Sequence, residues 1–209
     1  MSNLINCEQG SDEWLEIRKT LITASDFDAI VLKTGKLSKA EKVKKLCYNM
    51  ASGSFCKGVE LKKKSSGMER GNDLEPEARE YYSQATLSIV DEAGIFVMGS
   101  IGYSPDGLVG EHGLIEIKCP NRATHTKNLK NNCLPSEYKA QVQGGLAISG
   151  RSWCDFVSYH PDFKDHKLKM MLVRVERDEE YIKNLLESLD IFIKERDEIV
   201  SSIMKMRGL

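Results

Sequence analysis

The stretch Ser104–Pro120 reads SPDGLVGEHGLIEIKCP, and it decides how the chain folds. Its second half alternates charged and branched apolar residues, which predicts a β-strand with Glu116 and Lys118 on one face and Ile115 and Ile117 on the other. A charged pair in such an apolar strand costs desolvation unless a partner compensates for it. We therefore expect a bound divalent cation beside this strand.

Asp106 precedes the Gly-rich turn of residues 107–113, which brings it beside Glu116 on an adjacent strand. Mg²⁺ takes oxygen ligands and is held in proteins by one or two carboxylates together with waters and substrate phosphate oxygens. The backbone carbonyl of Ile117 can add a ligand. Lys118 would then orient or help to deprotonate a water and offset charge that builds on a phosphate. The motif predicts a phosphodiesterase.

A plainer interpretation of the same residues stays open. Glu116 and Lys118 could form an ion pair on a half-exposed strand, and Asp106 could serve only the Pro-Asp-Gly turn. The apolar surroundings of the charged pair favour the catalytic interpretation, because no solvent would compensate for the loss of hydration.

The remaining sequence predicts an α/β or α+β domain with a central mixed sheet flanked by helices, and we favour the α/β class. Short β-rich runs are expected at residues 87–91, 94–99, 102–110, 113–120, 153–159 and 168–176. The last stretch begins with an acidic turn and carries one apolar stripe, which predicts an amphipathic helix: Ile182, Leu185, Leu186, Leu189 and Ile193.

Length and composition favour one domain over residues 1–209, with a net charge of −1. The six cysteines are scattered without a C-x-x-C pair, so we expect reduced, mostly buried thiols. The N-terminal stretch lacks signal-peptide features, and no apolar run reaches the roughly 18 residues that span a bilayer. We expect a cytoplasmic protein, in a bacterial or phage-infected cell, that uses no membrane.

Motifs in order along the chain resemble the phage lambda exonuclease family, also called the YqaJ-type viral recombinase nucleases, within the PD-(D/E)xK superfamily. They are EQGSDEWLEIRKTLITASD, GNDLEPEARE, SPDGLV with GLIEIKCP, and YKAQVQ. The resemblance runs from about Glu8 into the final helix. It implies a restriction-endonuclease-like core.

The resemblance implies a role for each residue of the acidic motif. Asp106, Glu116 and the Ile117 carbonyl would bind metal, and Lys118 would be the catalytic lysine. Glu75 matches the family's additional acidic residue, which completes a second metal site. A carboxylate near a helix N-terminus is also explained by the helix dipole, and that explanation fits Glu77 equally well.

The same resemblance implies a pocket for a terminal 5′-phosphate formed by Arg18 and Ser25, with Ser104 and Gln141 near it. A guanidinium makes forked hydrogen bonds to phosphate, and hydroxyls complete them. Alternatives stay open: Arg18 could pair with a nearby glutamate, Ser25 could cap a helix, and Gln141 could be an exposed polar residue. Met68 matches the family's apolar wedge at the duplex end, although core packing would explain it as well.

The family resemblance implies a Mg²⁺-dependent 5′-to-3′ exonuclease on linear double-stranded DNA, with Mn²⁺ able to substitute. It would release 5′-mononucleotides, prefer 5′-phosphorylated ends, form a ring-shaped homotrimer and serve a single-strand annealing protein. Two alternatives remain: another PD-(D/E)xK nuclease, either an endonuclease or RecB-like, and a non-catalytic DNA-end-binding recombination partner. The loops Gly53–Gly67 and Asn121–Pro135 match nothing in the family, so their roles are open.

Overall fold

The described part of the chain is mainly helical up to residue 86, forms a run of consecutive strands over residues 90–118, and ends with helices and two longer strands. The computed structural model describes residues 3–56 and 66–208, with the side chains of residues 66–68 outside that description. The helices are α1 (Asp12–Lys19), α2 (Phe27–Ile30), α3 (Glu41–Ser52), α4 (Ser66–Thr86), α5 (Arg122–Asn131), α6 (Lys139–Ser149) and α7 (Glu179–Arg207). Short 3₁₀ helices are η1 (Ala24–Asp26), η2 (Ser136–Tyr138) and η3 (His166–Leu168). The strands are β1 (Asn3–Ile5), β2 (Ile22–Thr23), β3 (Val90–Asp91), β4 (Ile95–Met98), β5 (Ile101–Tyr103), β6 (Gly107–Val109), β7 (Gly113–Lys118), β8 (Trp153–Tyr159) and β9 (Met170–Glu176).

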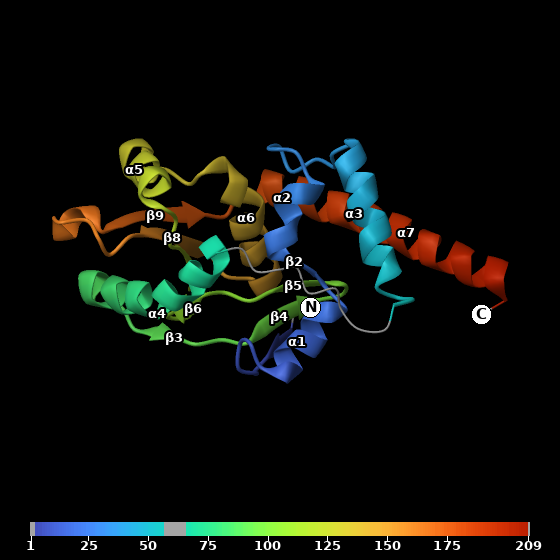
Figure 1. Ribbon diagram of the computed structural model, residues 1–209, viewed down its shortest axis with the longest axis horizontal. Helices are drawn as coiled ribbons and strands as arrows, with labels where there is room; N and C mark the ends of the chain where they lie inside the picture. Colours follow the sequence, from blue (N-terminus) through green and yellow to red (C-terminus); the bar gives the residue numbers. More distant parts are fainter. Residues whose placement is uncertain (1–2, 57–65, 209) are drawn as a thin grey trace.

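The strands form two mixed sheets (Figure 1). Within residues 3–56 and 66–208, one sheet has the order β1-β4-β5-β2 and the other β3-β6-β7-β8-β9. β2 is parallel to β5 and β7 is parallel to β8, while the other neighbours are antiparallel. The predicted α/β class with mixed sheets flanked by helices is confirmed, and the strands are divided between two sheets. The expected strand 102–110 is divided, because the chain leaves one sheet after Tyr103 and enters the other at Gly107.

The β6–β7 hairpin holds the Asp106–Lys118 motif at its open end. Its last backbone pair joins Gly107 to Ile115, and its turn contains Gly110 at a φ of 56°, a conformation that favours glycine. At the closed end, a Cβ on Gly113 would lie 2.2 Å from the Trp153 ring of β8. Glycine at this position therefore lets β8 pack beside the hairpin.

The two faces of β7 pack against different parts of the protein. Ile115 and Ile117 lie in a buried cluster with Tyr82 of α4. Leu114 belongs instead to the larger core, to which α6 and α7 contribute. Because alternate residues share a face, Glu116 lies on the Leu114 side. The predicted alternation is confirmed.

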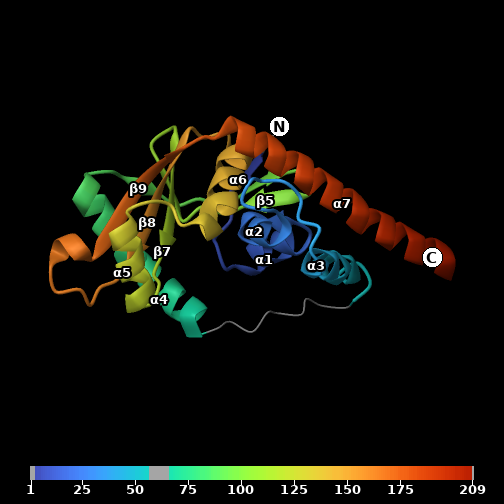
Figure 2. The ribbon, with the colours of Figure 1, turned by 90° about the horizontal axis from the view of Figure 1, so that it is seen from above.

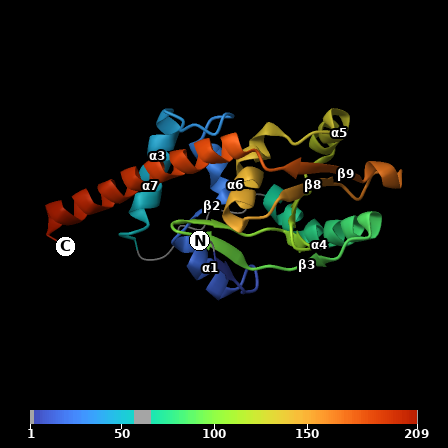
Figure 3. The ribbon, with the colours of Figure 1, turned by 180° about the vertical axis from the view of Figure 1, so that it is seen from behind.

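Helix α6 lies between the two sheets and contacts β4, β5 and β8 (Figure 3). A Cβ on Gly145 of α6 would come within 2.6 Å of the Tyr103 ring, so glycine lets this helix approach β5 closely. Helix α7 runs past α6 and α3, and its C-terminal end projects beyond the rest of the chain (Figures 1 and 2). Its predicted apolar stripe is confirmed, since Ile182, Leu185 and Leu189 are buried.

Two helices differ in how they begin and run. α3 begins at Glu41, and just before it the Ser38 hydroxyl accepts a hydrogen bond from the Ala40 N–H. α4 runs from Ser66 to Thr86 with Pro76 inside it. Cysteines 7, 47, 56, 119, 133 and 154 are free as predicted, but only three of them are buried. No helix in the described part of the chain has the length and apolar character to cross a membrane.

Candidate active site

Glu116 is the centre of the candidate site. The residue is 1% exposed, yet both carboxylate oxygens have hydrogen-bond partners. Oε1 accepts from Lys118 Nζ at 2.5 Å and from Gln141 Nε2 at 2.5 Å, and Oε2 accepts from the Tyr103 hydroxyl at 3.1 Å. β7, α6 and β5 thus each supply a donor to one buried carboxylate, which satisfies its need for hydrogen bonds.

Lys118 is held in its charged form beside this carboxylate. Burial disfavours the ammonium, but the negative charges of Glu116 and Asp106 outweigh burial and raise the pKa of Lys118 above its ordinary value. Nζ also lies 5.4 Å from the centroid of the Tyr138 ring. Because its pKa is raised, Lys118 acts at neutral pH as a hydrogen-bond donor and a positive charge, not as a free-amine base.

Asp106 is the second carboxylate of the site. Its Oδ2 accepts a hydrogen bond from the Ile117 N–H at 2.6 Å. Burial and then the charge of Glu116 raise the pKa of Asp106 well above its ordinary value, and the Lys118 charge opposes them only in part. Two carboxylates therefore share one ammonium, and the site attracts further positive charge.

The backbone beside these carboxylates offers one more oxygen. The β6–β7 ladder ends at the pair Gly107 and Ile115, so Ile117 lies beyond the last residue of β6. The N–H and C=O of one strand residue point toward the same side. Since the Ile117 N–H donates to Asp106, the Ile117 carbonyl points toward the Asp106 side of the strand as well. Two carboxylates and a carbonyl match the oxygen ligands that Mg²⁺ and Mn²⁺ prefer, so the residues fit a divalent cation.

Glu75 lies near the acids but is paired elsewhere. Its Oε1 is 2.6 Å from Arg79 NH2, one helical turn along α4, while its charge still contributes to the raised pKa of Asp106. Glu77 accepts a hydrogen bond from the Tyr159 hydroxyl at 2.7 Å and thus has a structural partner. In residues 3–56 and 66–208, no three His, Cys, Asp or Glu side chains are gathered as a ready metal site.

Arg18, Ser25 and Ser104 are brought together by two other side chains. The Arg18 guanidinium stacks 4.3 Å from the Trp14 ring centroid, and Trp14 Nε1 donates to Ser104 Oγ at 2.9 Å. Thr23 Oγ1 lies 3.5 Å from Arg18 NH2 and 2.9 Å from Ser25 Oγ. One guanidinium and several hydroxyls thus form a polar cluster, and Ser104 lies two residues before Asp106.

The other predicted site residues fall in different places. Gln141 lies against Glu116, on the acidic side of the site. Met68 belongs to α4, but its side chain lies outside the described residues, as do residues 57–65 of the loop Gly53–Gly67. The connection Asn121–Pro135 contains α5, whose first turn is capped by the Asn121 side chain.

Sequence reasoning missed four residues that shape the site: Trp14, Thr23, Tyr103 and Tyr138. Helical spacing would have pointed to two of them, because Trp14 lies four residues before Arg18 and Tyr138 three before Gln141. No local pattern indicates Tyr103. Its bond to Glu116 depends on how two separate sheets meet.

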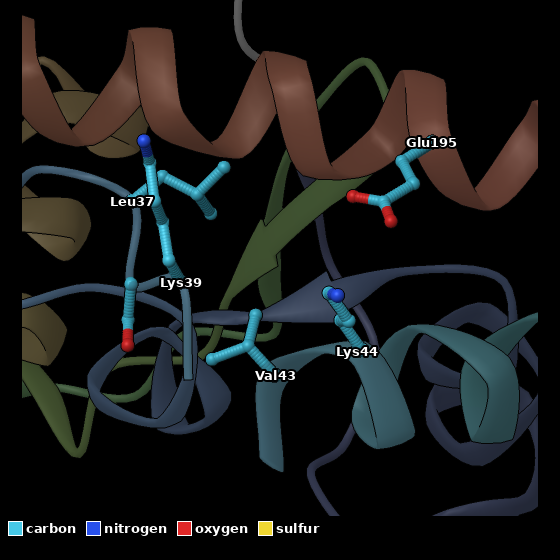
Figure 4. A pocket seen from close by; sticks show the side chains of 6 residues that line it. Leu37, Lys39, Val43, Lys44 and Glu195 are labelled. Carbon is cyan, nitrogen blue, oxygen red and sulfur yellow. The ribbon is translucent and has the colours of Figure 1, made fainter. Parts of the chain in front are cut away.

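A pocket of about 250 Å³ lies elsewhere, between the loop before α3, α3 itself and α7 (Figure 4). It is lined by Leu37, Ser38, Lys39, Val43, Lys44 and Glu195. It shares no residue with the acidic site, and its apolar floor and two flanking lysines offer no cluster of acids for metal chemistry.

The sequence matches the YqaJ-like viral recombinase domain over residues 13–152, more than half of the chain. This chain belongs to the YqaJ-like viral recombinase family. The matched region includes nearly all of α1 and the whole of α4, β5, the β6–β7 hairpin and α6, which together carry Glu75, Tyr103, Glu116, Lys118 and Gln141. No curated protein sequence matches the chain.

Solved structures agree with this YqaJ-like assignment. An alkaline exonuclease, LHK-Exo from Laribacter hongkongensis, is 31% identical, with 95% of this chain and 98% of that one covered and a TM-score of 0.85. The complex of LHK-Exo with dAMP is also 31% identical, with the same coverage and a TM-score of 0.84. A phage-related exonuclease from Haemophilus somnus 129PT shares the fold at 18% identity, with coverage of 88% and 96% and a TM-score of 0.71. The fold is that of a nuclease.

We predict that Asp106→Asn stabilises the metal-free protein. A carboxyl whose pKa is raised by folding contributes stability that is fully present below its ordinary pKa of about 3.9 and is lost as the pH rises through the raised value. The amide carries no charge and can still accept from Ile117 N–H. Calorimetry in EDTA should show a Tm higher by about 2–4 °C near neutral pH, with a smaller difference in acid.

Asp162→Asn is the matched control, because the Arg122 guanidinium lowers the pKa of this exposed carboxyl instead of raising it. Its substitution should give no increase in Tm. If the Asp106→Asn protein in EDTA melts at or below the wild-type temperature, the negative charge of Asp106 does not destabilise the folded protein.

Proposed function

We propose that residues 1–209 form a Mg²⁺-dependent exonuclease that shortens one strand of linear double-stranded DNA from its 5′ end. The observation that carries this proposal is the cluster of buried Glu116 with half-buried Lys118 and Asp106. Residues 104–106 connect it to the polar cluster of Arg18, Ser25 and Ser104, called the Arg18 cluster below. A site that holds a terminal phosphate next to a hydrolytic centre would act on chain ends.

The side chains divide the work of phosphodiester hydrolysis. Tyr103 and Gln141 hold Glu116, and Glu116 in turn fixes the Lys118 ammonium. Lys118 orients the attacking water through a donated hydrogen bond and stabilises the negative charge that builds on the phosphate oxygens. Asp106 stays beside the same region through the Ile117 N–H.

Asp106, Glu116 and the Ile117 carbonyl would hold the divalent cation, which Mn²⁺ could replace. When bound, the cation would supply Lewis-acid activation of water and neutralise charge on the phosphate. Glu75 would serve a second cation once it leaves its ion-pair partner Arg79. The raised pKa of Asp106 supports this assignment, because it shows that burial and the charge of Glu116 outweigh the charge of Lys118, so that a bound cation would stabilise the ionised carboxylate.

The Arg18 cluster supports the direction of digestion. Arg18, Ser25 and Ser104 offer a guanidinium and hydroxyls, the groups that bind a terminal phosphate dianion. A 5′-phosphate seated there would place the first phosphodiester toward Asp106 and Glu116. Hydrolysis would release 5′-mononucleotides, in keeping with the dAMP bound to LHK-Exo, and leave 3′ single strands for recombination by annealing.

The family resemblance extends the proposal to the assembly. A homotrimeric ring that encloses DNA would compensate for a net charge of −1, because enclosure replaces part of the phosphate attraction that open binding surfaces need. A single-strand annealing protein would receive the 3′ strand. The cytoplasm of a bacterial or phage-infected cell is the proposed location.

The decisive assay uses a 5′-phosphorylated linear duplex with a separate label on each strand end, incubated with and without Mg²⁺. Loss of nucleotides from the 5′ ends, only with metal, is expected, and closed circular duplex should stay intact. Cleavage of circles would indicate an endonuclease. End binding without mononucleotide release would indicate a non-catalytic module.

We predict that Lys118→Met lowers the rate of digestion by about 10²–10³-fold, because it removes the positive charge aimed at the phosphate. Lys139→Met is the matched control. Lys139 also lies near a tyrosine ring, at 4.4 Å from the Tyr181 centroid, but pairs with Asp178 away from the acids. Near-wild-type digestion by Lys118→Met would refute the catalytic role.

We predict that Arg18→Gln reduces the preference for 5′-phosphate over 5′-hydroxyl ends by about 10–100-fold, the value of one or two charged hydrogen bonds. Initial rates on the two substrates measure it. Lys19→Gln, one residue away and paired with Glu16, should keep the wild-type ratio. An equal loss on both substrates would contradict phosphate binding by Arg18.

A further inference from the structure

At the open end of the β6–β7 hairpin, β6 and β7 are no longer paired with each other beyond Gly107 and Ile115, and this is where Asp106 and Lys118 lie. On the β6 side the ladder stops at Gly107, immediately after Asp106, and β7 ends at Lys118. The carbonyls of the flanking residues, Pro105 before β6 and Cys119 after β7, therefore need partners from outside the hairpin. The structure supplies those partners from side chains.

Arg70 of α4 holds the β7 side. Its NH1 donates to the carbonyl oxygens of Cys119 at 3.1 Å and Pro120 at 2.7 Å. Its NH2 lies 2.9 Å from Nε2 of His160, a residue that is 2% exposed and follows β8 directly. One guanidinium thus fixes the backbone immediately after Lys118 to the end of the neighbouring strand.

Gln9 holds the β6 side. Its Nε2 donates to the Pro105 carbonyl at 2.7 Å and to the Ala93 carbonyl at 2.8 Å. The first bond fixes the residue before Asp106, and the second ties that residue to the segment that enters β4. Gln9 and Arg70 are far apart in the sequence, yet they bind the two sides of the open end of the hairpin, Gln9 before β6 and Arg70 after β7.

We propose that Arg70 and Gln9 are positioning residues that set the distance between the Lys118 ammonium and the Asp106 carboxylate. This inference rests on the proposed function of that site. Both side chains bind backbone carbonyls and act through the residues next to those carbonyls. Displacement of a reacting group by about 1 Å can cost 10²-fold in rate, so small shifts at this opening matter.

The chain contains matched clamps away from the site. Arg151 donates from NH1 to the carbonyls of Gly110 and Gly113, both at 2.7 Å, at the closed end of the same hairpin. Gln143 donates from Nε2 to the Glu176 carbonyl at 2.9 Å. These clamps make the same kinds of bond as Arg70 and Gln9, but they lie next to no proposed catalytic residue.

The test compares Arg70→Met with Arg151→Met. We expect single-turnover digestion to fall by at least about tenfold in Arg70→Met and to stay within about twofold in Arg151→Met, with similar losses of Tm. DNA-end affinity, measured in Ca²⁺, should be unchanged in both. Arg70→Lys should recover part of the rate, because the lysine Nζ can donate to one of the two carbonyls. If Arg70→Met does not fold, Arg70→Lys replaces it in the comparison with Arg151→Met.

A second arm measures metal binding without DNA. Gln9→Leu should weaken Mn²⁺ binding by about 10-fold in calorimetry, as expected when a group that orients a ligand is lost, while Gln143→Leu should not. Equal rates in the two arginine variants, together with equal Mn²⁺ affinities in the two glutamine variants, would overturn the proposal. A rate loss in Arg70→Met explained wholly by weaker DNA binding would also overturn it. A wild-type protein that digests no duplex would instead refute the proposed function, and the Mn²⁺ titration would still decide the positioning role.

Discussion

The charge of Glu116, buried in an apolar strand, is the constraint on which the site depends. Removing a carboxylate from water costs several kcal/mol unless hydrogen bonds and an opposite charge replace the lost hydration. Here the replacements come from Lys118 on the same strand, Gln141 on α6 and Tyr103 on β5. Those donors meet only if α6 lies between the two sheets, and glycine at position 145 permits that close approach. Fold and site are therefore specified by the same contacts.

The second carboxylate sets the charge balance of the site. Asp106 stands where the chain crosses from one sheet to the other, and its charge is not fully compensated by Lys118. A neutral residue at this half-buried position would favour stability, because surplus negative charge away from bulk water is unfavourable. The surplus is useful where cations and phosphates must be held together. Membership of the YqaJ-like family and the likeness to LHK-Exo agree with that chemistry.

Local patterns were enough to predict part of this structure. Alternation along Leu114–Lys118 correctly separated the charged face from the isoleucine face, and the apolar stripe of α7 was correct because both depend only on residue spacing. Long-range pairing was not predictable in the same way. β5 and β6 have three residues each, and nothing local shows that they join different sheets. The bond from Tyr103 to Glu116 and the clamps on Pro105 and Cys119 follow from that pairing, so sequence reasoning missed them.

Binding of a divalent metal by Asp106 and Glu116 can be measured in a crystal of the protein soaked in Mn²⁺, through the anomalous scattering of the ion. We expect a peak within bonding distance of the carboxylates of Asp106 and Glu116 and of the Ile117 carbonyl. A fully soaked crystal with no peak there, or with manganese held only by other residues, would show that these acids are not a metal site.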